Sequence, residues 1–271
     1  NVGQHILLRV QIPGSTGVYP WESPFVNGAS VINSGIEFQL GYGGSKGKFS
    51  YNINANVSTL KNRVLSLGYG NNPIYGYGSM TKTEVGREVG ELYGWVIEGI
   101  FQTQDEINAL NAESPIGRYQ EDLTRPGDYK FKDINGRDAS GKLTGIPDGK
   151  IDDDDRTYLG SAIPDLYFGL NANFRYGQFD LSLVASGVSG NKIFNAIRAS
   201  IENGGGWDNY SKKLLNCWNE NNKETDVPRV VMFDPNKNGR ASSRWLENGS
   251  FFRITSLQVG YTLPQATLSR I

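Results

Sequence analysis

The sequence predicts an all-β fold of antiparallel strands that cross a lipid bilayer, and three observations lead to this prediction. The first is a strict alternation of apolar and small polar residues from Lys48 to Ser58. The second is a return of the same two-strand unit at residues 166–186. The third is the contrast between very short turns and very long connections. Together they favour part of a large antiparallel transmembrane β-barrel with long extracellular loops that contain short helices.

The segment from Lys48 to Ser58, KFSYNINANVS, has apolar residues at its odd positions and Ser or Asn between them. Successive side chains of a strand point to opposite faces, so one face is apolar and the other carries neutral amides and hydroxyls. A tilted strand of about ten residues is long enough to cross a bilayer. A half-buried strand of a soluble β-sandwich alternates in the same way, so this segment alone leaves both folds open.

Two hairpins with tight turns follow from the same alternation. In the first hairpin, residues 36–42 are connected by the turn from Gly43 to Gly47 to the strand from Lys48 to Ser58. In the second, residues 166–176 are connected by Gly177 and Gln178 to residues 179–186. Aromatic side chains gather beside both short turns, namely Tyr42, Phe49, Tyr51, Phe174, Tyr176 and Phe179. This grouping fits an aromatic girdle at a membrane interface, although aromatic pairs also stabilise soluble sheets.

The alternation predicts which side chains face lipid and which face an aqueous lumen. The apolar set consists of Ile53, Ala55, Leu170, Ala172, Leu181 and Leu183. The lumen set consists of Asn52, Asn54, Asn171 and Asn173.

The long connections, residues 59–165 and 189–249, are expected to be extracellular loops with some structure of their own. A helix is expected over residues 103–112, with Thr103 as its cap, and others near residues 193–202 and 210–218. Residues 6–12 are predicted to form a strand, followed by a loop as far as about Asn33. A last strand is predicted near residues 251–263.

Composition excludes several classes of function. The net charge of -1 and the lack of a long basic block argue against a nucleic-acid partner. Cys217 and His5 are the single cysteine and histidine, which excludes an internal disulfide and zinc sites built from several such residues. A serine or cysteine hydrolase would need His5 as its base. No enzymatic activity is therefore expected.

Seven phrases of the sequence resemble, in order and spacing, the C-terminal barrel half of SusC/RagA-type TonB-dependent transporters of Bacteroidetes. They are SGIEFQLGYG, FSYNINANVS, LYGWVIEGIFQTQDEI, PGDYKFKDING, DGKIDDDDRTYLG, PDLYFGLNANFRYGQFDLSL and NGSFFRITSLQVGYTLP. The resemblance runs from about Leu7 to Ile271. It implies a 22-stranded barrel in the bacterial outer membrane, in contact with its lipid, with residues 1–271 as the C-terminal portion of the barrel.

The resemblance also implies a function and partners. A SusC-like importer takes up oligosaccharides or peptides together with a SusD-like lipoprotein that acts as a lid, and the TonB complex drives uptake through the N-terminal region. The sequence shows no N-terminal plug, no TonB box and no strands after GYTLP, so we expect it to be part of a longer protein. An incomplete barrel has open strand edges, so we expect these 271 residues to fold stably only together with the remainder of the barrel.

An acidic stretch is the one candidate for a metal site. Asp133 and Asn135, then Asp148 and Lys150, then Asp155 follow the calcium-loop pattern D-x-N-G-D-G-x-I-x-x-x-D if residues 137–147 are an insertion. Calcium takes six to eight oxygen ligands, and alternate positions of a tight loop can converge on it, with Lys150 offering its carbonyl. The insertion, and an Asp where an EF-hand has Glu, depart from the pattern. A solvated charge run or helix start at residues 152–155 is the alternative.

Three tryptophans in the long connections, Trp95, Trp207 and Trp218, are candidates to stack on sugars or peptide side chains, although packing within their own loops explains them as well. Two alternatives to the importer stay open. One is a soluble calcium-stabilised β-sandwich that acts as a carbohydrate-binding module. The other is a calcium-dependent secreted hydrolase.

Overall fold

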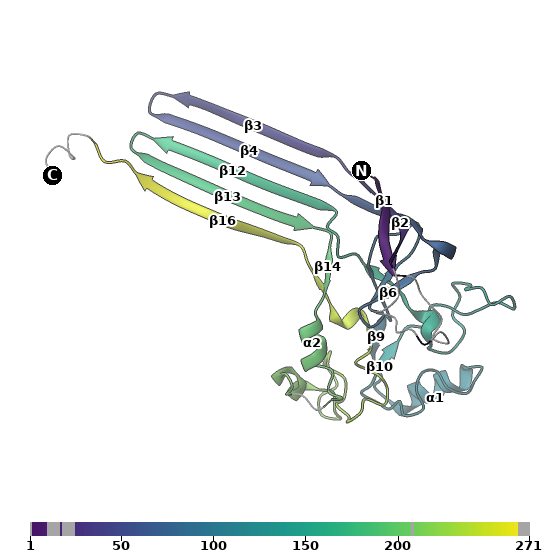
Figure 1. Cartoon of the computed structure of the whole chain (residues 1–271). Helices are drawn as coiled ribbons and strands as arrows, with labels where there is room; N and C mark the ends of the chain where they lie inside the picture. The colour runs from purple at the N-terminus through teal and green to yellow at the C-terminus, as the bar shows by residue number, and fades with distance from the viewer. Residues whose placement is uncertain (1, 10–16, 18–24, 207–208, 265–271) are drawn as a thin grey trace.

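A long antiparallel sheet extends from a unit of loops and small sheets in the computed structural model, which describes residues 2–9, 17, 25–206 and 209–264 (Figure 1). The sheet has five strands in the order β16-β13-β12-β4-β3. Their bounds are β3 Glu37–Lys46, β4 Phe49–Thr59, β12 Leu166–Tyr176, β13 Phe179–Ser189 and β16 Phe251–Tyr261. Both hairpins predicted from the alternation are present, and pairing of β4 with β12 joins them.

The register of the sheet keeps apolar and polar side chains on separate faces. One row across the five strands, on the apolar face, consists of Leu40, Ala55, Leu170, Ala185 and Ile254. The neighbouring row, on the polar face, consists of Gly41, Asn54, Asn171, Val184 and Ser256. The alternation read along one strand therefore holds across the whole sheet.

Strand β16 keeps its apolar residues from Phe252 to Tyr261 on one face by means of a bulge. Its pairing with β13 shifts by one residue between Val184 and Ala185, and the Thr255 hydroxyl there donates to the Val184 carbonyl at 3.1 Å. An extra residue in one strand changes the phase of its alternation. Ile254 and Leu257 consequently share a face although an odd number of positions separates them.

The hairpin of β3 and β4 continues beyond the sheet, which corrects the expected loop before Asn33. Strand β2, Phe25–Ser34, precedes β3 directly and pairs with β5, Lys61–Leu67, which follows β4. The bend between β2 and β3 lies at Gly35, where a Cβ atom would collide with the Thr59 carbonyl oxygen. Only glycine permits that approach of the two chains. Strand β1, Val2–Arg9, pairs with the other edge of β2.

The long connections contain further short strands. Strands β6 Ile74–Gly76, β7 Thr81–Thr83, β8 Glu91–Gly94 and β11 Thr157–Gly160 form a sheet in the order β11-β8-β7-β6. Two other pairs are β9 Ile97–Ile100 with β10 Tyr129–Phe131, and β14 Lys192–Phe194 with β15 Leu246–Asn248. Each of these pairings lies within one connection. The bridge between Trp95 and Ser242 joins the two connections into one folded unit, named here the loop unit.

The helices partly match the sequence prediction. Helix α1 spans Gln104–Glu113, and the Thr103 hydroxyl accepts from the Glu106 amide, as expected of its cap. Helix α2 is limited to Ala196–Ile201, and the helix expected near residues 210–218 is a 3₁₀ turn, Lys212–Asn216. Other 3₁₀ turns are Tyr69–Asn71, Asp153–Asp155 and Ser243–Trp245. Within the described ranges no helix is both long and apolar enough to span a membrane.

Candidate functional site

The apolar face of the five-stranded sheet is uncovered over its length. Phe38, Leu40, Leu257 and Val259 are 57–75% exposed, whereas soluble domains bury most side chains of this kind. Near the tight turns a row of aromatic residues crosses this face, formed by Phe49, Tyr176, Phe179 and Tyr261. The rings of Phe179 and Tyr261 lie 4.8 Å apart. The expected aromatic grouping therefore exists in space.

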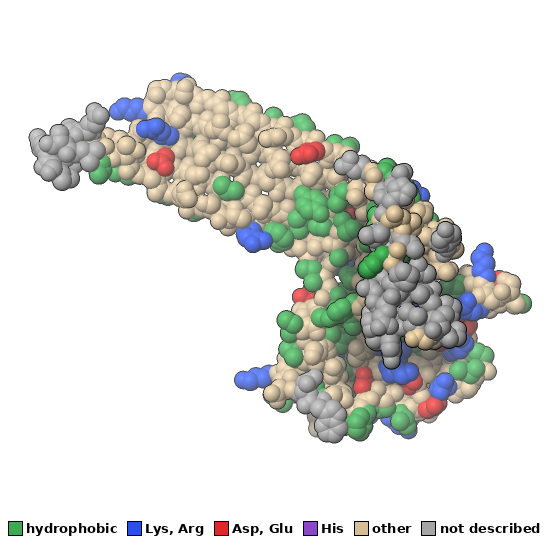
Figure 2. Space-filling model, viewed as in Figure 1, with side chains coloured by type: hydrophobic (Ala, Val, Ile, Leu, Met, Phe, Trp, Pro, Cys, Tyr) green, Lys and Arg blue, Asp and Glu red, His purple; other side chains and the backbone are tan. Residues whose placement is uncertain are grey.

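The opposite face is polar and uncharged at its centre. Asn54 lies opposite Asn171, and Asn52 lies opposite Asn173. Along each strand one amide donates to the next, from Asn54 to Asn52 at 2.5 Å and from Asn173 to Asn171 at 2.9 Å. The side of the sheet seen in Figure 2 carries few hydrophobic side chains. The sheet thus presents two surfaces suited to two different solvents.

The loop unit has an apolar core of its own. Phe101, Ile107, Tyr119, Tyr129, Phe131 and Ile151 are buried together. All come from the first long connection, and helix α1 contributes the buried Ile107 and the partly buried Leu110, which packs against the cluster. This core gives the connection a fixed structure without help from the sheet.

A buried polar network attaches the second connection to that core. The Arg229 guanidinium donates to both carboxylate oxygens of Asp128, at 2.8 and 2.7 Å, and Asn238 adds a third bond at 3.0 Å. The Asn238 carbonyl accepts from the Tyr129 amide, and its neighbour Asn236 donates to the Tyr129 carbonyl. The side chain of Asp128 is 1% exposed. The network therefore fixes the two connections to each other.

The structure brings parts of the predicted calcium loop together. The Asp133 carboxylate accepts from the amides of Asp148 and Gly149 at 3.2 and 2.6 Å. The Lys150 ammonium lies 3.3 Å from the Asp148 carboxylate and also pairs with Asp152. Within the described residues, no three Asp, Glu, His or Cys side chains form a group that could hold a metal ion. Backbone amides and Lys150 are thus the partners of these carboxylates.

Asp155 is the buried acidic residue of this loop. One of its oxygens accepts from the amides of Ile134 and Asn135, and the other accepts from that of Asp152. Burial, with the charge of Asp133 as a smaller cause, raises the pKa of Asp155 to about 6. Asp155 therefore holds the two halves of the loop together by its hydrogen bonds, whatever else it binds.

The tryptophan candidates pack inside the loop unit. Trp218 is 7% exposed and its indole donates to the Gln102 side chain at 3.0 Å. Trp95 is half-buried and its indole donates to the Asp152 carbonyl at 2.9 Å. Trp207 lies outside the described residues. Trp218 as placed offers no open ring face to a ligand.

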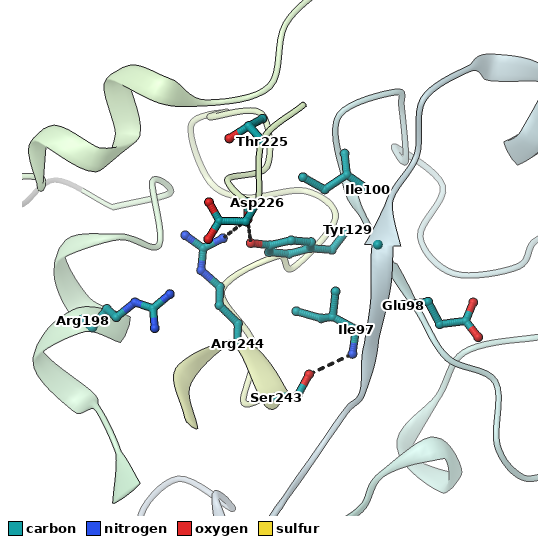
Figure 3. Close-up of a pocket in the computed structure, with 10 residues that line it drawn as sticks. Ile97, Glu98, Ile100, Tyr129, Arg198, Thr225, Asp226, Ser243 and Arg244 are labelled. Carbon is teal, nitrogen blue, oxygen red and sulfur yellow. Dashed lines mark hydrogen bonds between the residues drawn. The ribbon is translucent and has the colours of Figure 1, made fainter. Parts of the chain in front are cut away.

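A cavity of about 320 Å³ opens between the first and second connections (Figure 3). Strand β9 and Tyr129 of β10 form one wall, and helix α2 and the 3₁₀ turn at residues 243–245 approach from the other side. Two arginines, Arg198 and Arg244, line it. Burial lowers the pKa of Arg244 to about 10. The cavity thus combines apolar walls with the two arginines, and the carboxylates Glu98 and Asp226 also line it.

The chain is similar to two TonB-dependent receptors of Formosa agariphila. It is 27% identical to TonB-dependent receptor P3, over 98% of this chain and 25% of that receptor. It is 29% identical to TonB-dependent receptor P26, over 96% of this chain and 24% of that receptor. No family model matches it. Its structure superposes on the RagAB peptide transporter with a TM-score of 0.73 at 24% identity, covering 99% of this chain and 26% of that one. A closed state of the RagAB peptide importer gives 0.72 at 23% identity.

The chain is similar to TonB-dependent receptors over almost its whole length. It spans about a quarter of the length of the receptors that it matches. Its all-β fold is that of the RagAB transporter over the shared region. The arrangement of the strands β3, β4, β12, β13 and β16 and the loop unit is thus shared with the RagAB transporter.

Sequence reasoning missed the buried residues Asp128 and Arg244 and the Asp128 partner Arg229. Asp128 and Arg229 are 101 positions apart and Arg244 follows in a 3₁₀ turn, so no local pattern connects them. A weak signal existed in the second connection, which has the arginines Arg229, Arg240 and Arg244 among aromatic and apolar residues. Arginine in such surroundings needs a partner, and that need is a reason to search for one.

Proposed function

We propose that this receptor segment forms part of the wall of an outer-membrane importer. The apolar face of the sheet contacts lipid, and the asparagine face lines an aqueous interior. The observation that carries this proposal is the exposure of large apolar side chains such as Leu257 and Val259 along a whole sheet face. A soluble β-sandwich would cover that face with a second sheet, and the described residues contain no such layer.

Import is proposed to depend on TonB and on partners outside this segment. We expect the TonB complex to act through the N-terminal region of the full receptor, and a SusD-like lipoprotein to cover the loop unit as a lid. Oligosaccharides or peptides are the proposed cargo. Similarity to receptors named TonB-dependent supports the energy source, and the peptide transporter of similar fold supports peptides as one cargo class.

Labelling on intact cells tests the orientation that the proposal requires. In a full receptor with Cys217→Ser, a single cysteine is introduced either as Ser140→Cys in the loop unit or as Lys48→Cys at a tight turn. Both positions are exposed. A membrane-impermeant maleimide should label the first on intact cells and the second only after lysis. Labelling of Lys48→Cys on intact cells would reverse the orientation and refute the proposal.

Uptake measurements test the energy source separately. Accumulation of a labelled peptide or oligosaccharide mixture is compared in cells with the receptor, without it, and with the receptor but without TonB. The proposal predicts that the last two strains accumulate equally little. Uptake that depends on the receptor but continues without TonB would contradict it.

We also propose a structural calcium ion in the loop from Asp133 to Asp155, with Asn135, Asp148 and the Lys150 carbonyl as further ligands. Support comes from the closeness of Asp133 to residue 148 and of Asn135 to Asp155. Binding requires the Lys150 ammonium to leave Asp148, and both side chains of this ion pair are partly accessible to water. When bound, calcium would neutralise the carboxylates and fix the surface on which lid and cargo dock.

A further inference from the structure

Arg244 is a buried arginine with too few hydrogen bonds. Its side chain is 4% exposed, and its Nε atom has no hydrogen-bond partner. The two other contacts of the guanidinium are long, 3.4 Å to the Asp226 carbonyl and 3.4 Å to the Glu202 carboxylate. A guanidinium carries five N–H donors and keeps its charge, so it requires more than this.

Other arginines of the loop unit show what full pairing looks like in this protein. Arg229 makes two bonds below 3 Å to the Asp128 carboxylate. Arg240 donates at 3.0 Å to Glu121 and to the backbone carbonyls of Asn236 and Lys237. Arg118 and Arg156 also have an Nε atom without a partner, but each makes a short hydrogen bond, to the Asp122 carboxylate at 2.9 Å and to the Ser79 carbonyl. Arg244 differs from them because both of its hydrogen bonds are long.

A second guanidinium shares the same carboxylate. Arg198 donates to Glu202 at 3.0 Å and lies 3.5 Å from Glu247, and Lys213 approaches Glu202 at 4.0 Å. The Glu202 side chain is 8% exposed. One buried carboxylate thus serves three cations. A further carboxylate placed between Arg198 and Arg244 would give Arg244 the short charge-assisted bond that Glu202 does not supply.

The cavity has space and apolar walls for the rest of such a ligand. Its volume of about 320 Å³ is at the lower end for small-molecule sites. Ile97, Ile100 and the ring of Tyr129 face it beside the two arginines (Figure 3). The Ser243 hydroxyl accepts from the Ile97 amide at 3.1 Å and can still donate its own proton to a ligand oxygen.

We propose that this cavity binds a carboxylate carried on an apolar group, with Arg244 and Arg198 pairing the carboxylate and the Ile97, Ile100 and Tyr129 wall receiving the apolar part. A free organic acid and the C-terminal end of a peptide share this chemistry. The proposal concerns binding and stands independently of import.

Calorimetry on the purified full receptor tests the proposal with a matched ligand pair. N-acetyl-leucine carries the carboxylate, and N-acetyl-leucinamide has nearly the same shape without the charge. We expect the acid to bind at least about tenfold more tightly, because the charge-assisted bonds are lost in the amide. Equal affinity for the two, or no binding of the acid, would overturn the proposal.

Variants assign the binding to this cavity. Arg198→Gln keeps the partly exposed helix surface intact and should weaken binding of the acid at least about tenfold. Arg244→Met should weaken binding of the acid by a similar factor. If the change at the buried Arg244 prevents folding, Arg198→Gln alone tests the site. Arg125→Met removes an equal charge from an exposed site outside the cavity and should change nothing. Unchanged binding in Arg198→Gln would place the acid elsewhere.

A peptide pair identifies the source of the carboxylate. Trileucine with a free C-terminus is compared with its C-terminal amide. Tighter binding of the free peptide than of N-acetyl-leucine supports the cavity as a site for peptide ends. A preference for N-acetyl-leucine over the peptide supports a site for small acids.

Discussion

Replacing Asp128 by Ala should loosen the loop unit while leaving the five-stranded sheet assembled. The change removes the only carboxylate that Arg229 contacts in the described structure, and it also removes the acceptor of Asn238. Breaking a buried ion pair from one side costs about 3–5 kcal/mol. The Arg229 side chain is 22% exposed, so water replaces part of the loss and we take the lower limit, about 3 kcal/mol. A loss of that size corresponds to roughly a hundredfold more frequent local opening.

Hydrogen exchange measured by mass spectrometry on the assembled receptor is the suitable assay. Peptides that cover residues 99–131 should exchange roughly a hundredfold faster in Asp128→Ala, while peptides from β12 and β13 stay unchanged. The control is Asp122→Ala, which breaks the exposed pair with Arg118 and should cost at most about 1 kcal/mol. Equal exchange in the two variants would refute the view that the Asp128 network holds the two connections together.

Three other changes test separate parts of the structure. Gly35→Ala introduces a Cβ atom that collides with the Thr59 carbonyl oxygen. The amount of folded, heat-resistant barrel on gels of unboiled samples should therefore fall. An unchanged amount would contradict the claim that the bend at Gly35 requires glycine. Leu170→Arg near the bilayer midplane should lower the free energy of unfolding in denaturant titrations by about 2–4 kcal/mol. Asn171→Arg on the other face should be tolerated. Equal losses in the two variants would argue against one face in lipid and the other in water. Calcium should protect residues 133–155 from protease, and chelation or Asp148→Ala should remove that protection; the same cleavage with and without calcium would exclude the site.

Alternation was sufficient to predict the strands that contact two different environments. In β4 and β12 every second residue is constrained by its surroundings, so the period of two is visible in the sequence. In β16 the bulge at Thr255 breaks that period, so Phe252 and Ile254 are out of phase with Leu257 in the sequence alone. The position of the bulge is set by pairing with β13, which a local pattern does not contain.

Strand β2 was missed for a related reason. Its sequence, FVNGASVINS, contains Gly and several small polar residues that are typical of loops. Pairing with β1 on one side and with β5 on the other determines its conformation, and β5 lies more than twenty residues further along the chain. Tertiary pairing outweighs strand propensity here.

The candidate site was predictable only in part. The capping Thr103 and the acidic residues of the loop are local patterns, and the sequence displays them directly. The pairing of Asp128 with Arg229 and the cavity beside Arg244 depend on contacts between the two long connections. Such contacts leave no periodic trace in a single sequence.

Cysteine labelling of the two sheet faces tests the central claim most directly. In the full receptor with Cys217→Ser, single cysteines replace Asn54 or Asn171 on one face and Leu170 or Leu181 on the other, and membranes are treated with a water-soluble maleimide. The account predicts rapid labelling at the two asparagine positions and protection at the two leucine positions until detergent is added. Rapid labelling at the leucine positions in intact membranes, with the asparagine positions protected, would contradict it.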